Sequence, residues 1–115
     1  MKQRLKNFVD DRGLLFSFYK KKFKFNRIFF ISGNKNKVRG DHAHKELTQI
    51  LINIDSKSKL EIGKNKKKTI TFSKPGEYII CPKKNWLKIR FFSKGTIAVL
   101  CDKKYDKKDY IYKKK

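Results

Sequence analysis

Short apolar stretches alternate with polar turns along most of this chain. From Gly13 onward, runs rich in Ile, Leu, Val and Phe are separated by clusters of Gly, Pro, Asn, Asp, Ser and Lys, most of them residues that favour tight turns. Runs of this length and spacing predict short β-strands. The predicted strands cover Leu14–Tyr19, Arg27–Ser32, Leu47–Ile54, Lys59–Ile62, Lys68–Phe72, Tyr78–Cys81, Trp86–Phe92 and Thr96–Cys101.

The same pattern predicts the fold class. No segment before Asp102 keeps a helical period over about ten residues, which argues against βαβ folds and helical DNA-binding motifs. Many short strands in one small chain assemble most simply as a jelly roll or cupin-like double-sheet barrel, so we predict an all-β fold. The stretch Asp102–Tyr112 mixes charges with Tyr and predicts a short C-terminal helical turn, followed by a frayed tail at residues 113–115.

Length and charge limit the possible functions. With 115 residues the chain has room for one core, so we predict a single domain over residues 1–115 and exclude a two-domain enzyme. Its 32 basic and 10 acidic side chains give a net charge of +22, which favours anionic partners. The lysines are spread through turns and tail, whereas arginine, the residue best suited to planar recognition of phosphate, occurs only at Arg4, Arg12, Arg27, Arg39 and Arg90.

The cysteines and the N-terminal residues indicate a compartment. Cys81 and Cys101 each end an apolar run without Cys-x-x-Cys spacing, which predicts buried, reduced thiols. The first residues lack the apolar segment of a leader, and no stretch approaches the length of a membrane span. We therefore expect a cytoplasmic protein with no membrane partner.

Both histidines of the chain lie in one short segment, Val38–Lys45. In an extended strand, residues two apart point to the same face, so His42 and His44 are expected to enter the same space. Imidazole titrates near neutral pH and transfers protons, and Arg39 supplies a permanent positive charge for an oxyanion or a phosphate. The segment thus predicts a two-histidine proton-transfer site.

A metal site is the alternative for a His-x-His sequence. The carboxylates nearby in sequence are Asp41 and Glu46, strand alternation places Asp41 on the opposite face, and the chain has no third histidine. A catalytic metal normally takes three or more protein ligands. We therefore predict that the site uses no metal.

Further motifs accompany the histidine segment in a fixed order from about residue 10 to residue 112. They are Asp11-Arg12-Gly13, Arg27-Ile28-Phe29-Phe30-Ile31, Arg39-Gly40-Asp41-His42-Ala43-His44-Lys45, Gln49, Pro82-x-x-x-Trp86, Phe92-Ser93 and Tyr105-Asp106-x-x-Asp109-Tyr110-Ile111. In this order they resemble the WxcM-like cupins, the sugar-nucleotide 3,4-ketoisomerases.

The resemblance implies a fold, a reaction and a partner. It implies a cupin homodimer that converts dTDP-4-keto-6-deoxyglucose to a dTDP-3-keto-6-deoxyhexose through an enediol, without metal or other cofactor. The implied pathway makes deoxyamino sugars for surface glycans such as lipopolysaccharide O-antigen. In this interpretation His44 is the base that shuttles the proton, His42 is its partner, and Arg39 stabilises the enediolate or contacts the diphosphate.

Four more positions are expected at the substrate, three of them with a structural alternative. Gln49 would hydrogen-bond the sugar or hold a histidine tautomer, or is only a polar residue facing the barrel. Trp86 would line the pocket or pack in the core, and Arg12 would meet the nucleotide or the partner subunit or belong to an ordinary turn. Phe30 stands where many family members have Tyr, so a hydroxyl that orients the substrate is missing there.

Two other classes of function stay open at this point. A basic barrel with interleaved Phe and Tyr also suits nucleic acid, but that hypothesis gives His42 and His44 no task, so we predict no nucleic-acid partner. The second class is a cupin that binds a sugar nucleotide without turning it over, or a metal-dependent enzyme with incomplete ligands.

Overall fold

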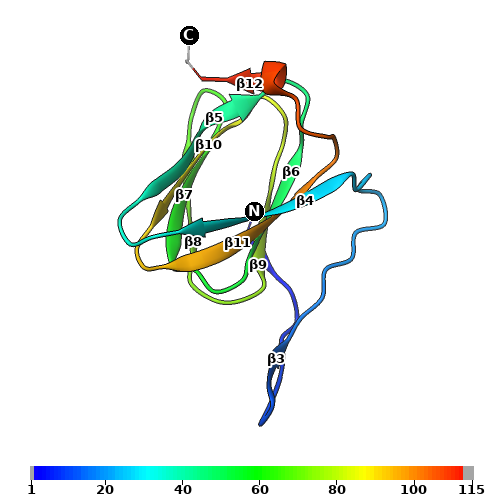
Figure 1. Ribbon diagram of the computed structural model, residues 1–115, viewed down its shortest axis with the longest axis vertical. Helices are drawn as coiled ribbons and strands as arrows, with labels where there is room; N and C mark the ends of the chain where they lie inside the picture. Colours follow the sequence, from blue (N-terminus) through cyan, green and yellow to red (C-terminus); the bar gives the residue numbers. More distant parts are fainter. Residues whose placement is uncertain (1, 113–115) are drawn as a thin grey trace.

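The computed structural model describes residues 2–112 and shows a small barrel of β-strands (Figure 1). Over these residues there are twelve strands and one short 3-10 helix: β1 (Gln3–Arg4), β2 (Phe8–Asp10), β3 (Gly13–Leu15), β4 (Arg27–Gly33), β5 (Val38–His44), β6 (Gln49–Asn53), β7 (Ser58–Gly63), β8 (Lys68–Phe72), β9 (Glu77–Cys81), β10 (Trp86–Phe91), β11 (Gly95–Cys101), η1 (Lys107–Asp109) and β12 (Tyr110–Ile111).

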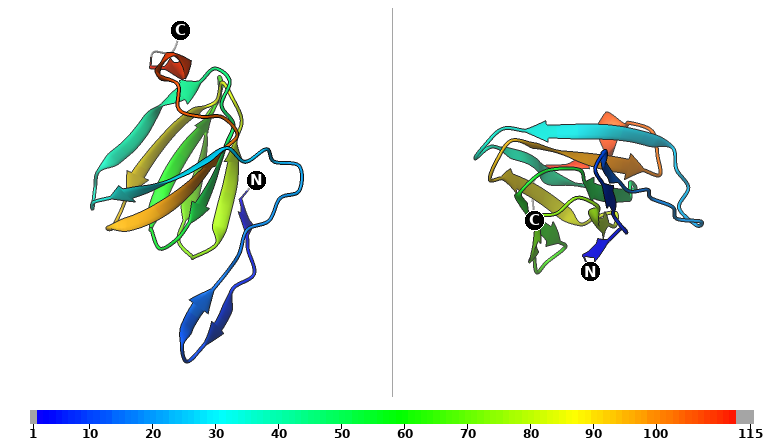
Figure 2. Two further views of the ribbon diagram at one scale, coloured as in Figure 1. Left: turned by 45° about the vertical axis from the view of Figure 1, so that its right-hand side comes forward. Right: turned by 90° about the horizontal axis from the view of Figure 1, so that it is seen from below.

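Two five-stranded sheets face each other across the barrel (Figure 2). The first has the order β1-β9-β6-β11-β4 and the second the order β12-β5-β10-β7-β8. Strands paired as neighbours are antiparallel, and many are distant in sequence, as in a jelly roll. The predicted all-β double sheet is confirmed, and so is the short helical turn, which is η1. The described part of the chain contains no helix long and apolar enough to cross a membrane.

The core between the sheets follows from the alternation of apolar and polar residues along each strand. On β7, Leu60 and Ile62 face the opposite sheet, whereas Lys59 and Glu61 line a surface hollow on the outside of the barrel. Phe72 and Phe91 are among the fully buried side chains of this core. Each such side chain stabilises the fold by about 1.5–3 kcal/mol relative to leaving it in water.

The predicted strand Leu14–Tyr19 is wrong beyond Leu15. Only its first residues form a strand, β3, which pairs with β2 in a hairpin that the sequence pattern did not predict. The residues that follow are irregular and cross the outer face of the first sheet, where three phenylalanines cover Ile50, Ile52 and Ala98; they are Phe16, Phe18 and Phe23. These phenylalanines are apolar because they cover the outer face of a sheet, and they do not form part of a strand.

Four strands are missing from the predicted set, although the histidine segment that forms β5 was treated as extended, and their composition explains why. β1, β2 and β12 have two or three residues, too few to show an alternation. β5 is rich in charged residues and histidine, and its first four residues are exposed, so it lacks the apolar run that marks a strand. The other seven predicted strands are confirmed with small differences at their ends. The predicted frayed tail, residues 113–115, lies outside the described residues.

Both cysteines are free and buried, as predicted. Burial raises the pKa of the Cys81 thiol to about 12, so this group stays protonated at neutral pH. Cys101 lies on β11 opposite Gln49 of β6, next to the site described below.

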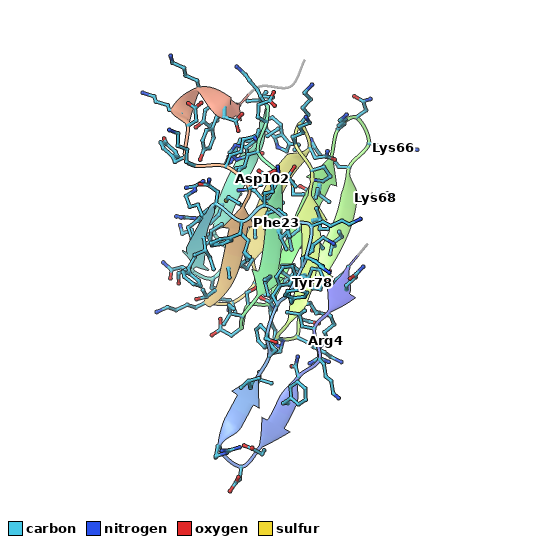
Figure 3. All side chains as sticks on the ribbon, turned by 90° about the vertical axis from the view of Figure 1, so that its right-hand side faces the viewer. Arg4, Phe23, Lys66, Lys68, Tyr78 and Asp102 are labelled. Atoms are coloured by element: carbon cyan, nitrogen blue, oxygen red, sulfur yellow. The ribbon has the colours of Figure 1, made fainter. Side chains whose placement is uncertain are left out.

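The hairpin of β2 and β3 projects away from the barrel (Figures 1 and 3). Four of its apolar side chains are largely exposed, namely Phe8 (54%), Val9 (74%), Leu14 (44%) and Leu15 (62%). A lone two-stranded hairpin is marginally stable in water, so this apolar surface is suited to a partner.

A buried asparagine at the end of β6 connects the turn that follows this strand to the turn between β8 and β9. Asn53 is fully buried, and its side-chain amide donates to the carbonyls of Ser56 (3.0 Å) and Lys74 (2.9 Å) and accepts from the Ser56 amide (2.9 Å). We expect Asn53→Ala to lower the free energy of unfolding by about 3 kcal/mol, because buried backbone groups lose their partners. Urea denaturation measures this. Asn65→Ala, in an exposed turn, is the matched control, and an equal effect of both variants would contradict the expectation.

Candidate active site

One end of the barrel holds a cavity of about 210 Å³ between the two sheets. Its polar wall comes from β5 of the second sheet and Gln49 of the first, and the remaining wall is mostly apolar. The residues that line it are Phe29, Phe30, Ile31, Arg39, Gly40, His42, His44, Gln49, Leu51, Leu87, Ile89, Val99 and Tyr110. The two histidines predicted from sequence therefore line a cavity inside the barrel.

A bulge in β5 decides which side chains share the cavity. Regular alternation would place Arg39 on the face opposite to His42 and His44. The pairing with β10 shifts register between Leu87 and Lys88, so Arg39 lies opposite the core residue Ile89 while His42 lies opposite Leu87. The extra residue is taken up where Gly40 and Asp41 adopt left-handed backbone angles, with φ of 81° and 68°. The bulge therefore brings Arg39 to the same cavity as both histidines.

The two histidines are neighbours, as the two-residue spacing predicts. The centroids of the His42 and His44 rings are 5.0 Å apart, with their planes at 82°. The ring of Tyr110 on β12 lies against both, at 4.8 Å from His42 and 4.4 Å from His44. Tyr110 is placed there because β12 pairs with β5 and puts Tyr110 opposite His44.

A carboxylate that sequence reasoning did not assign completes the pair. Asp109 lies 65 residues from His44 in sequence, yet its Oδ2 is 3.1 Å from His44 Nδ1. Its other oxygen accepts from the Glu46 amide at 2.8 Å. The turn η1 positions Asp109, because the side chain of Asp106 accepts from the Lys108 amide at 2.9 Å and caps that turn. The motif Tyr105-Asp106-x-x-Asp109-Tyr110-Ile111 thus forms a turn that positions a carboxylate next to His44.

Burial sets the protonation state of the histidines. It lowers the pKa of His42 and is also the largest cause of the lowered pKa of His44. The charge of His42 acts in the same direction on His44, and the hydrogen bond with Asp109 opposes it. Both rings are therefore neutral at pH 7. With Nδ1–H donated to Asp109, the lone pair of His44 is on Nε2, which is buried and has no hydrogen-bond partner among the described residues.

The structure brings some of the predicted substrate residues to this cavity. Gln49 is 6% exposed and lines it. Phe30 lies at the rim and is 63% exposed, because alternation along β4 turns its neighbour Phe29 inward against the core. A tyrosine in place of Phe29 would therefore carry its hydroxyl deeper into the barrel than a tyrosine in place of Phe30.

Two other predicted residues lie elsewhere. Trp86 begins β10, and its side chain lies on the outer face of the second sheet, where Nε1 donates to Asp41 at 2.9 Å and the ring lines a separate surface hollow. This hydrogen bond thus anchors the bulge at Asp41 from the outer face of the sheet. Arg12 is at the turn of the projecting hairpin, where its guanidinium pairs with Asp10 at 2.6 Å. Within the described chain neither side chain touches the cavity.

In the part of the chain that the structure describes, metal ligands do not gather around the histidine pair. Among residues 2–112, no three His, Cys, Asp or Glu side chains gather in a group able to hold a metal ion. Trp86 Nε1 binds Asp41 outside the cavity, so this carboxylate lies on the opposite face of β5, as strand alternation predicts. The chemistry that this donor set supports is proton transfer.

The double-sheet barrel with a histidine pair inside it defines the class, that of cupin-like barrels with an internal proton-transfer site. Within that class the chain belongs to the FdtA family, described as WxcM-like, C-terminal, whose family model matches residues 2–115. The resemblance found in the sequence motifs is thereby confirmed.

Characterised relatives agree on the reaction. The chain is 30% identical, over 92% of its length and 81% of the relative's, to a TDP-4-oxo-6-deoxy-α-D-glucose-3,4-oxoisomerase of Aneurinibacillus thermoaerophilus. A crystal structure of a 3,4-ketoisomerase from Helicobacter canadensis is 30% identical, with a TM-score of 0.87 over 98% of this chain and 90% of that one. The ketoisomerase QdtA of Thermoanaerobacterium thermosaccharolyticum, a His-to-Asn variant in complex with TDP-4-keto-6-deoxyglucose, is 26% identical, with a TM-score of 0.86 over 98% and 86% of the two chains. The relatives support an isomerase and not a nucleic-acid-binding barrel.

Proposed function

We propose that this protein converts dTDP-4-keto-6-deoxyglucose to a dTDP-3-keto-6-deoxyhexose. The observation that carries the proposal is the pair of neutral imidazoles in one cavity, with Asp109 bound to His44 at 3.1 Å. Two bases of near-neutral pKa beside a sugar suit a reaction that only moves protons. The relative from Aneurinibacillus thermoaerophilus is named for this isomerisation, and the one from Helicobacter canadensis is a 3,4-ketoisomerase.

The reaction divides into two proton transfers. In the first, the free Nε2 of His44 removes the proton from C3, electrons move into the C3–C4 bond, and the C4 oxygen takes up a proton to give the enediol. In the second, the C3 hydroxyl loses its proton and C4 receives one, which leaves the carbonyl at C3. His42, 5.0 Å away by ring centroids, holds or relays the proton at the two oxygens. Atoms balance without an oxidant, a reductant or a metal.

The size of the cavity indicates how the substrate lies. At about 210 Å³ it is smaller than the roughly 300–1,000 Å³ of sites that enclose drug-sized ligands. The hexose therefore enters, and the nucleotide stays outside. Arg39 lies at the exposed rim and is suited to the diphosphate or to the enediolate, while buried Gln49 is suited to a sugar hydroxyl or to the carbonyl.

A proton-exchange assay tests this function. The purified protein is mixed with dTDP-4-keto-6-deoxyglucose in D2O, and C3 and C4 are followed by NMR. We expect a 3-keto product with deuterium at C4, at a rate unchanged by dialysis against EDTA. Absence of both turnover and exchange at C3 would overturn the proposal. A product would supply the ketone that an aminotransferase needs to make a deoxyamino sugar.

We also propose that the protein works as a cytoplasmic homodimer. The exposed apolar hairpin supports a second copy as its partner, as does the edge strand β4, on which Ile28 is 45% exposed. Arg12 at the hairpin turn then lies near the partner subunit. The free thiols Cys81 and Cys101 suit a reducing compartment. Light scattering after gel filtration should give twice the chain mass for the protein and a monomer for the double variant Val9→Lys, Leu15→Lys; a monomeric parent protein would contradict the proposal.

A further inference from the structure

The bulge in β5 separates Arg39 from the two histidines along the strand. The segment after the bulge has strands on both sides, because β10 pairs with His42 and β12 pairs with Ala43 and His44. Arg39 comes before the bulge, where β10 alone pairs with β5 in the described part of the chain. The direction of Arg39 relative to the histidines is therefore decided by the bulge.

The backbone of the bulge has positive φ at two consecutive residues, Gly40 (81°) and Asp41 (68°). Glycine adopts this conformation at little cost, and a Cβ atom at Gly40 would lie only 3.0 Å from the carbonyl oxygen of Leu87. At Asp41 the left-handed conformation is uncommon, although Asp adopts it more readily than most residues. Asp41 also has no partner on β10 in the register of the two strands. The strand ladder by itself therefore does not hold Asp41 in place.

Trp86 contacts Asp41 from the outer face of the sheet. The indole Nε1 donates to Oδ1 of Asp41 at 2.9 Å, between residues 45 positions apart in sequence. The indole itself is held firmly, since Trp86 is 9% exposed and Nζ of Lys67 lies 5.3 Å from the centre of its ring. The next residue on β10 is Leu87, which lies opposite His42 at the register shift. The donor is thus fixed directly beside the bulge.

We propose that Trp86 and Asp41 are positioning residues of this isomerase, and that their hydrogen bond on the outer face holds the bulge of β5 in the register that turns Arg39 into the cavity. Without the extra residue at this place, strand alternation would return Arg39 to the outer face, away from the histidines. In the described part of the chain neither Trp86 nor Asp41 lines the cavity, so their effect passes through Arg39. The inference rests on the proposed function for its kinetic consequences only.

Three substitutions separate the hydrogen bond from the left-handed backbone. Trp86→Phe removes the donor and keeps an aromatic ring, Asp41→Gly removes the acceptor but suits the positive φ, and Asp41→Asn keeps an acceptor. We expect kcat/KM to fall about tenfold in Trp86→Phe and in Asp41→Gly, because Arg39 loses its orientation, and to stay within about twofold of the parent in Asp41→Asn. Parent-like activity of Asp41→Gly would mean that the left-handed backbone alone sets the bulge, which overturns the inference.

A double-mutant cycle with Arg39 distinguishes positioning from a general loss of stability. Arg39→Met removes the group that the hydrogen bond directs, so adding Trp86→Phe to Arg39→Met should lower kcat/KM by less than about twofold, against about tenfold in the parent protein. Asn53→Ala, which acts on turns outside β5, is the control, and its effect should be the same in both backgrounds. A tenfold cost of Trp86→Phe in both backgrounds would remove Arg39 from the argument and overturn the inference.

NMR tests the same contact without turnover. Trp86 is the one tryptophan of the chain, so its indole N–H gives a single signal. We expect this signal to move upfield and to exchange faster with water in Asp41→Gly than in the parent protein and in Asp41→Asn. Nuclear Overhauser contacts between Arg39 and Ile89, which are cross-strand partners, report the register and should weaken in Trp86→Phe. An unchanged indole signal in Asp41→Gly, or unchanged contacts in Trp86→Phe, would overturn the inference.

The two possible failures can be told apart. Thermal denaturation checks that each variant folds, and if Trp86→Phe does not fold, Asp41→Gly takes its place in the cycle and in the Overhauser measurement, with the same expected results. If the parent protein does not turn over substrate, the proposed function fails, while the indole signal and the register contacts still decide whether Trp86 and Asp41 hold the bulge.

Discussion

Replacing His44 by Asn should lower kcat by about a thousandfold or more, because no other group takes the place of the base in the first proton transfer. Asn keeps a similar size and polarity near Asp109, so the cavity is conserved. The decisive readout is deuterium exchange at C3 in D2O, which isolates that first transfer. We expect this exchange to disappear in His44→Asn together with product formation.

His42→Asn is the matched comparison for this variant. If His42 only holds or relays the proton at the sugar oxygens, its loss should slow product formation but leave measurable exchange at C3. The reverse pattern, exchange lost in His42→Asn and kept in His44→Asn, would exchange the roles of the two rings within the same mechanism. Full activity in both variants would remove the histidine pair from the mechanism.

The second large effect is expected for Asp109→Asn. The carboxylate fixes His44 with Nδ1–H donated at 3.1 Å and Nε2 free, and an amide also offers its N–H group to Nδ1, which stabilises the wrong tautomer. We expect kcat to fall about a hundredfold while KM changes little. Steady-state kinetics with dTDP-4-keto-6-deoxyglucose measures both constants.

The pH profile of this variant adds a signed expectation. The parent profile should have its acid limb below pH 6.5, the ordinary pKa of histidine, because burial lowers the pKa of His42 and of His44. Asp109 raises the pKa of His44, so Asp109→Asn should move the acid limb to still lower pH. Glu61→Gln, on the outer face of β7, is the control for loss of one carboxylate. A limb that moves upward in Asp109→Asn would contradict the pairing with His44.

The strands of the barrel were largely predictable because their alternation is local. On β10, Leu87 and Ile89 alternate with Lys88 and Arg90, so the pattern itself shows which residues face the core. The stretch from Phe16 to Phe23 misled the prediction, since the same apolar residues can form a strand or cover a sheet from outside. Only the presence of Ile50 and Ile52 on that outer face distinguishes the two.

The candidate site was only half predictable. Within β5, the spacing of His42 and His44 is a local property, and it correctly placed both rings in one space. The roles of Asp109 and Tyr110 were not assigned, although each belongs to a motif noted in the sequence. Their approach to the histidines depends on strand pairing between segments far apart along the chain. The capping sequence Asp106-x-x-Asp109 was the available signal, since it marks a turn that fixes a carboxylate.

Sequence alone determined the all-β fold, the paired histidines and the family, because these follow from residue periodicity and from motifs that are contiguous along the chain. Tertiary structure alone decided which charges meet those histidines. A bulge at Gly40 and Asp41 turns Arg39 into the cavity, and the pairing of β12 with β5 brings Asp109 to His44. The physical reason is that side-chain direction within a strand is set by local geometry, whereas register between strands is set by the packing of the whole barrel.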